Sequence, residues 1–144
     1  MKLTVEGLRG AGGFTGAAVK RSISWKHNGE EFDADVFVRQ LSYQSAVTDA
    51  RALSTDGDLA AARIAHCICD DSGKPIFKIS DITGIEDDGS PVLHEVDGEM
   101  VPRGQLNSEL GTALLVAISE VNEMGKPKAR KKRVSRKKTS SGTN

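Results

Sequence analysis

The sequence predicts an α+β domain, in which an N-terminal β-hairpin packs on a small bundle of about three helices. The first observation is a segment that alternates apolar and polar residues on both sides of Asn28-Gly29. The second is that three later segments repeat apolar residues at helical spacing. We therefore expect a flexible glycine-rich arm over 1–18, a single domain over 19–125 and a disordered basic tail over 126–144.

Charge is divided unevenly along the 144 residues. Nine of the 20 Lys and Arg residues lie beyond residue 125, which leaves 11 against 20 acidic residues in 1–125, a net charge of −9. No apolar run approaches the roughly 18 residues of a membrane helix, and the N-terminus has no apolar core of a signal peptide. The sequence thus predicts a cytoplasmic protein with an acidic body, a cationic tail and no membrane association.

The glycine-rich start matches no complete phosphate-binding pattern, neither G-x-x-x-x-G-K-[ST] nor G-x-G-x-x-G opening a helix, which favours a flexible arm. The hairpin that follows has a definite register, because a type I′ turn at Asn28-Gly29 fixes every cross-strand pair. One face then carries apolar pairs and the other polar pairs: Trp25–Phe32, Ile23–Ala34, Arg21–Val36 and Val19–Val38, against Lys26–Glu31, Ser24–Asp33 and Ser22–Asp35. We expect the Trp25/Phe32 face to rest on helices.

Two helices are predicted next, as an antiparallel pair. Ser42 is a candidate N-cap for a helix with an apolar face made of Tyr43, Ala46, Val47, Ala50 and Leu53. Asp58 precedes a nearly all-apolar helix that extends to Cys69, and Gly73 and Pro75 prevent its continuation. A helix of this composition must be buried on most sides.

The sequence of residues 78–103 predicts short strands and a helical turn rather than long elements. Over 78–85 we expect a short strand and then a helical turn capped by Ser80, and over 91–101 a second hairpin around Asp97-Gly98. The last predicted helix begins after Asn107 or Ser108 and ends near Gly125. Its apolar stripe, widened by Leu115 and Val116, is broader than a solvent-exposed helix requires.

No constellation of residues indicates an enzyme, a metal site or a cofactor. Cys67 and Cys69 point to divergent faces of the predicted helix, so they do not form a stabilising disulfide, and they lack a second downstream pair for zinc. We interpret them as small buried hydrophobic residues. The acidic clusters are interpreted as solvated charge rather than as a general acid and base. No nucleophile motif such as G-x-S-x-G is present.

The basic tail has two interpretations. It could neutralise phosphates of a nucleic acid non-specifically, or dock on an acidic protein surface, including the domain's own. Composition does not separate them. The charged residues are Lys126, Lys128, Arg130, Lys131, Lys132, Arg133, Arg136, Lys137 and Lys138.

Three stretches within residues 19–124 resemble the tail assembly chaperones of long-tailed, siphovirus-type bacteriophages. They are 38–43 (VRQLSY), 63–77 (RIAHCICDDSGKPIF) and 114–122 (LLVAISEVN). The segment 86–103 departs from the family pattern and looks like an insertion. The resemblance implies a non-enzymatic protein of the host cytoplasm, absent from the mature virion, that binds the tape measure protein, keeps it soluble and promotes polymerisation of the tail tube protein.

The resemblance also implies an exposed apolar surface for the client. The candidate residues are Ile64, Ile68, Leu110, Leu114, Leu115, Ile118 and Val121. The same residues could instead form the domain's own core. Self-association is a further expectation, as is a ribosomal frameshift near the tail that yields a longer product. The alternatives are a nucleic-acid-binding accessory protein acting through the tail and a structural virion component.

Overall fold

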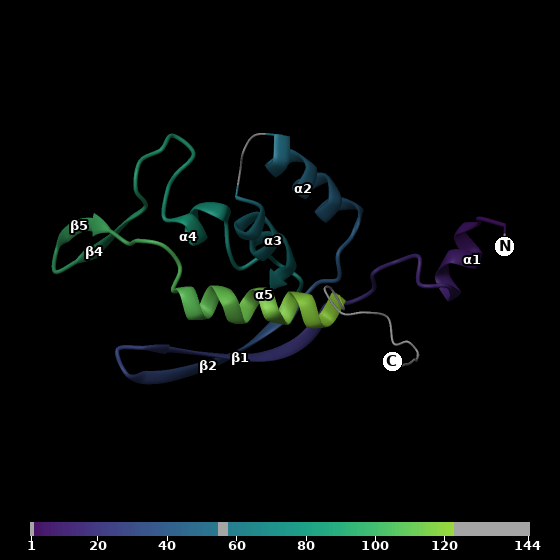
Figure 1. Ribbon diagram of the computed structural model, residues 1–144, viewed down its shortest axis with the longest axis horizontal. Coiled ribbons are helices and arrows are strands. Elements are labelled where there is room, and N and C mark those ends of the chain that lie inside the picture. Colours follow the sequence, from purple (N-terminus) through teal and green to yellow (C-terminus); the bar gives the residue numbers. More distant parts are fainter. Residues whose placement is uncertain (1, 55–57, 123–144) are drawn as a thin grey trace, which may run out of the picture.

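The computed structural model describes residues 2–54 and 58–122, and it confirms the mixed α+β class. A long hairpin of β1 (Val19–His27) and β2 (Glu30–Val38) lies along one side of α5 (Ser108–Asn122) (Figure 1). Three helices lie on the other side: α2 (Tyr43–Ser54), α3 (Leu59–Cys67) and α4 (Ile79–Thr83). The short helix α1 (Val5–Gly10) buries no residue and stands apart from this body. It forms inside the segment for which the sequence predicts a flexible arm.

The hairpin has the predicted register, with Trp25 opposite Phe32 and Val19 opposite Val38. The two aromatic rings stack with their centroids 5.8 Å apart. Asn28 and Gly29 have φ values of 52° and 82°, as a type I′ turn requires. On the polar face of the described hairpin, the ion pair joins Lys20 to Asp35 rather than Lys26 to Glu31.

The core lies between the apolar face of the hairpin, α3 (Leu59–Cys67) and α5. Its buried members come from all three elements: Ile23, Val36, Val38, Ile64, Cys67, Ile68, Leu114, Ala117 and Ile118. Helix α3 begins as predicted, because the Asp58 carboxylate accepts a hydrogen bond from the Ala61 amide at 2.9 Å. Segments that are far apart in the sequence thus contribute to one core.

The predicted end of α3 is wrong. The helix stops at Cys67, and Ile68–Cys69 form a short strand, β3, that pairs with Val38 and Phe37 of β2. These two residues gain long-range backbone hydrogen bonds along the edge of β2 that a helix could not give them. The resulting sheet has the order β1-β2-β3.

The predicted inner face of α2 (Tyr43–Ser54) is also wrong. Tyr43 is 84% exposed, whereas Ser45 is buried. The Ser42 hydroxyl accepts a hydrogen bond from the Ser45 amide, as an N-cap does, and Asp49 one turn later forms an ion pair with Arg63 of α3. The Asp49–Arg63 ion pair therefore links α2 to α3, whereas the contacts of Ser45 lie within the start of α2.

The region after Phe77 contains α4 (Ile79–Thr83), with no preceding strand among the described residues and no cap at Ser80. The helix begins earlier because the Asp81 carboxylate accepts a hydrogen bond from the Lys78 amide at 2.9 Å. The predicted second hairpin is present as β4 (Leu93–Val96) and β5 (Glu99–Pro102). Asn107 is the N-cap of α5, because its side chain accepts from the Leu110 amide.

Candidate functional site

An apolar groove lies where α3, α4 and the first half of α5 meet, and its volume is about 500 Å³. Its apolar lining consists of large side chains with small residues between them: Ile64, Ile82, Ile85, Leu106 and Leu115, and Ala60, Ala61 and Gly111. Polar residues complete the lining: Asp58, Thr83, Gln105, Asn107, Ser108 and Thr112. A second hollow of about 440 Å³ shares residues 105–107 and extends toward Ile76 and Phe77. The lining of this hollow is mixed, because Asp81 and Arg103 lie beside Ile76 and Phe77.

Local structure explains how the groove stays open. Helix α4 is one short turn that ends at Gly84, and the Leu106 amide donates a hydrogen bond to the Ile82 carbonyl at 2.9 Å. This bond fixes the chain before α5 against α4 and forms one wall. Ile85, just beyond α4, is 51% exposed and belongs to the rim.

The lining of the groove includes only two of the seven residues predicted to contact a client: Leu115, which is half-buried, and Ile64, which is 2% exposed and also belongs to the core. Three others, Ile68, Leu114 and Ile118, are at most 1% exposed and belong to the core. Leu110 and Val121 are half-buried and pack against that core. Val116 is 49% exposed, so part of the broad stripe on α5 does face solvent.

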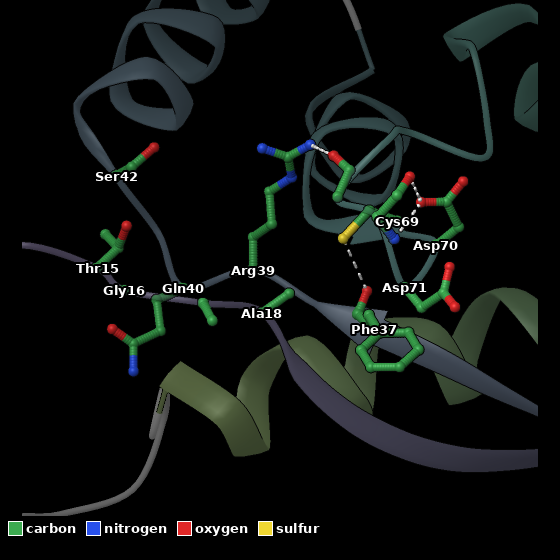
Figure 2. A pocket seen from close by; sticks show the side chains of 13 residues that line it. Thr15, Gly16, Ala18, Phe37, Arg39, Gln40, Ser42, Cys69, Asp70 and Asp71 are labelled. Atoms are coloured by element: carbon green, nitrogen blue, oxygen red, sulfur yellow. Dashed lines mark hydrogen bonds between the residues drawn. The ribbon is translucent and has the colours of Figure 1, made fainter.

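A separate pocket, more polar than the groove, lies where β2 leads into α2 and has a volume of about 380 Å³ (Figure 2). Arg39 reaches from the end of β2 to the 70–74 turn, where it donates a hydrogen bond to the Gly73 carbonyl. Its Nε atom is buried and has no hydrogen-bond partner within the described part of the chain. This side chain therefore joins the sheet to the turn that follows β3.

The turn at 70–74 is built around the carboxylate of Asp70. It accepts hydrogen bonds from the Ser72 amide, the Ser72 hydroxyl and the Lys74 amide at 2.9, 2.7 and 3.0 Å. These bonds hold the pKa of Asp70 below its ordinary value, and the bond from the Ser72 hydroxyl has the largest effect. Asp70, the first residue of the D-D-S-G-K-P motif, thus stabilises the turn.

The remaining candidates for chemistry are buried or dispersed. Cys67 and Cys69 are free thiols with no exposed surface, and burial raises the pKa of Cys67 to about 11. Burial also lowers the pKa of His66, to which the Arg39 charge contributes. Across residues 2–54 and 58–122, no group of three His, Cys, Asp or Glu side chains is placed to hold a metal ion.

The nine basic residues predicted to form an electrostatic tail lie outside the described residues. In the described parts of the chain, no helix combines the length and hydrophobicity needed to cross a membrane. Among the described residues, the apolar groove and the polar pocket are candidate binding surfaces.

Residues 6–122 match the model of the family described as phage tail assembly chaperone, TAC. Comparisons with curated proteins and with solved structures found no significant match. The match covers the hairpin, the core helices and the 86–103 segment alike. The chain belongs to the phage tail assembly chaperone family, whose members assist assembly and are not enzymes.

Proposed function

We propose that this chaperone binds an amphipathic helical segment of the phage tape measure protein in the groove between α3, α4 and α5. Grooves of this kind take the apolar face of a helix, with anchors spaced one turn apart. The apolar lining and the exposed Ile85 at the rim support this proposal. The acidic body, with its net charge of −9 over residues 1–125, would keep such a complex in solution.

Gly111 is the observation on which the proposal mainly rests. It lies in α5, where alanine would favour the helix by up to about 1 kcal/mol. A Cβ atom at this position would meet only Leu106, at 4.0 Å. Packing within the chain therefore does not require glycine here. The missing side chain does keep the groove open along one wall.

The decisive experiment co-expresses the chain with its tape measure protein and measures how much of the latter stays in the soluble fraction. Ile85→Glu places a charge on the groove rim and is expected to reduce that fraction severalfold. Ile79→Glu is the matched control, since Ile79 is 46% exposed and lies outside the groove. Equal effects of the two substitutions would contradict the proposed site.

A second pair of variants tests the groove from the opposite wall. Gly111→Leu fills the space, so we expect lost client solubility with an intact fold. Gly111→Ala adds one methyl group to the groove wall and should weaken client binding less than Gly111→Leu does. Circular dichroism and the thermal midpoint of each variant establish that the fold is unchanged.

We further propose that the complex forms in the host cytoplasm, recruits tail tube subunits and leaves before the virion is complete. Mass spectrometry of infected cells and of purified virions tests this, with the chain expected in the former only. Peptides continuing in another reading frame near residues 126–138 would demonstrate a frameshifted product. A strong signal from virions would favour a structural role.

A further inference from the structure

The segment 86–102, which we call the hairpin lobe, projects from the body beside α4 (Figure 1). Seven of the eight residues in its strands β4 and β5 are exposed, so neither face of this two-stranded sheet packs on the domain. A two-stranded ribbon without a covered face is only marginally stable in water. A surface that covers the lobe is therefore expected.

The base of the lobe is firmly attached. Val92 is buried, its amide donates to the Gly84 carbonyl at 2.9 Å, and its carbonyl accepts from the Arg103 amide at 2.8 Å. Arg103 also forms an ion pair with Asp81 of α4, with 3.1 Å between nitrogen and oxygen. These contacts fix where the lobe leaves the body.

The lobe has an unusual surface chemistry. It contains no Lys or Arg and six acidic residues: Glu86, Asp87, Asp88, Glu95, Asp97 and Glu99. Leu93, Val96 and Met100 lie among them and are 46%, 46% and 60% exposed. Lysine and arginine suit such a surface, because their stems cover apolar groups while their charged ends reach carboxylates.

The chain itself contains the complementary sequence at 126–138, with nine Lys and Arg residues and no acidic residue. This segment follows Asn122, at the end of α5 that lies away from the lobe (Figure 1). Helix α5 has 15 residues and so spans about 22 Å, whereas Lys126 can lie at most about 13 Å from Asn122. Lys126 therefore cannot reach the lobe of its own copy, whereas Lys138, separated from Asn122 by up to about 50 Å of extended chain, can, so the experiment must distinguish contacts within one copy from contacts between copies.

We propose that the basic segment 126–138 of one copy docks on the hairpin lobe of a second copy. Each copy then has the hairpin lobe near the first residue of α5 and the basic segment beyond the last residue of that helix. Such a head-to-tail contact is heterologous and generates rings or filaments of copies. The inference is independent of the proposed groove and its client.

The first experiment is analytical ultracentrifugation of nuclease-treated full-length protein over a range of concentrations. Association is expected at about 50 mM salt and its loss at about 500 mM, since exposed charges are then screened. Glu95→Lys with Glu99→Lys should raise the apparent dissociation constant about tenfold or more. Glu30→Lys with Glu31→Lys, the same charge change on the β1–β2 hairpin, should have a much smaller effect.

A mixing experiment identifies which copy supplies the segment. One variant has the two lobe substitutions, and the other has R130Q, K131Q, K132Q and R133Q in the tail. Each alone should be monomeric, whereas the mixture should form a heterodimer through the intact tail of the first and the intact lobe of the second. A monomeric mixture, or association that disappears on nuclease treatment, would overturn the proposal.

Discussion

The side-chain oxygen of Asn122 accepts a hydrogen bond from the Leu41 amide, with 2.7 Å between the two atoms. The same side chain donates to the Ile118 carbonyl at 2.9 Å. The last residue of the described α5 therefore satisfies the backbone of the connection between β2 and α2. The side-chain amide of Asn122 therefore makes both a local hydrogen bond within α5 and a long-range hydrogen bond to Leu41.

Asn122→Ala should lower the free energy of unfolding by about 1–3 kcal/mol, because it leaves the half-buried Leu41 amide without an acceptor. Urea unfolding followed by circular dichroism measures this change. Asn122→Asp retains the acceptor and loses the donor, so a smaller effect is expected. If alanine and aspartate were equally destabilising, the hydrogen bond to Leu41 would not be the main contribution.

Local sequence rules predicted those parts of the fold that local geometry determines. The Asn28-Gly29 turn fixes the hairpin register, and Asp58 and Asn107 begin their helices as caps do. The rules failed where long-range contacts compete with periodicity. Ile68 and Cys69 continue an apolar helical pattern, yet they pair with β2.

Asp70→Asn should destabilise the protein at neutral pH and have progressively less effect in acid. The folded pKa of Asp70 is lowered, so its ionised form contributes stability that is fully present above the unfolded pKa of about 4 and is lost as the pH falls through the folded pKa. The urea midpoint of both proteins, measured from about pH 6 downward, should therefore converge.

Asp71→Asn is the matched control for that pH series. Asp71 is exposed in the same turn, and its side chain makes no hydrogen bond or ion pair within the described residues. Its substitution should leave the midpoint nearly constant relative to wild type at every pH. A pH-dependent difference as large as that of Asp70→Asn would show that general surface charge, rather than the turn, is responsible.

Cys67 should resist thiol reagents in the folded protein. Its side chain has no exposed surface, and burial raises its pKa to about 11, so almost no thiolate exists near pH 8. Titration with a chromogenic disulfide reagent should detect no fast thiol in the native protein and two in denaturant, because Cys69 is equally buried. Rapid native labelling of Cys67 would contradict the packing of α3.

The groove was only partly predictable. The apolar pattern identified Ile64 and Leu115, but Ile82, Ile85 and Leu106 come from segments whose placement depends on α4 and its contacts with the chain before α5. Periodicity within one helix cannot reveal a surface assembled from three elements. A glycine inside the α5 pattern, Gly111, was the one available signal.

Gly84→Ala should loosen the base of the hairpin lobe. A Cβ atom on Gly84 would lie 2.7 Å from the backbone carbon and oxygen of Gly104, and the φ of Gly84 is +76°. We expect a loss of more than about 1 kcal/mol in unfolding free energy. Hydrogen exchange of the Val92 and Arg103 amides should become faster, since both bonds lie at this base.

Gly89→Ala is the control that separates the steric contact between residue 84 and Gly104 from the strain of a left-handed backbone. Gly89 has a similar φ of +88°, but a Cβ atom there would meet nothing within 4 Å. It should therefore show only the cost of the left-handed conformation, and exchange at Val92 should change less than in Gly84→Ala. If both variants behaved alike, the close approach of Gly84 and Gly104 would not be what holds the lobe.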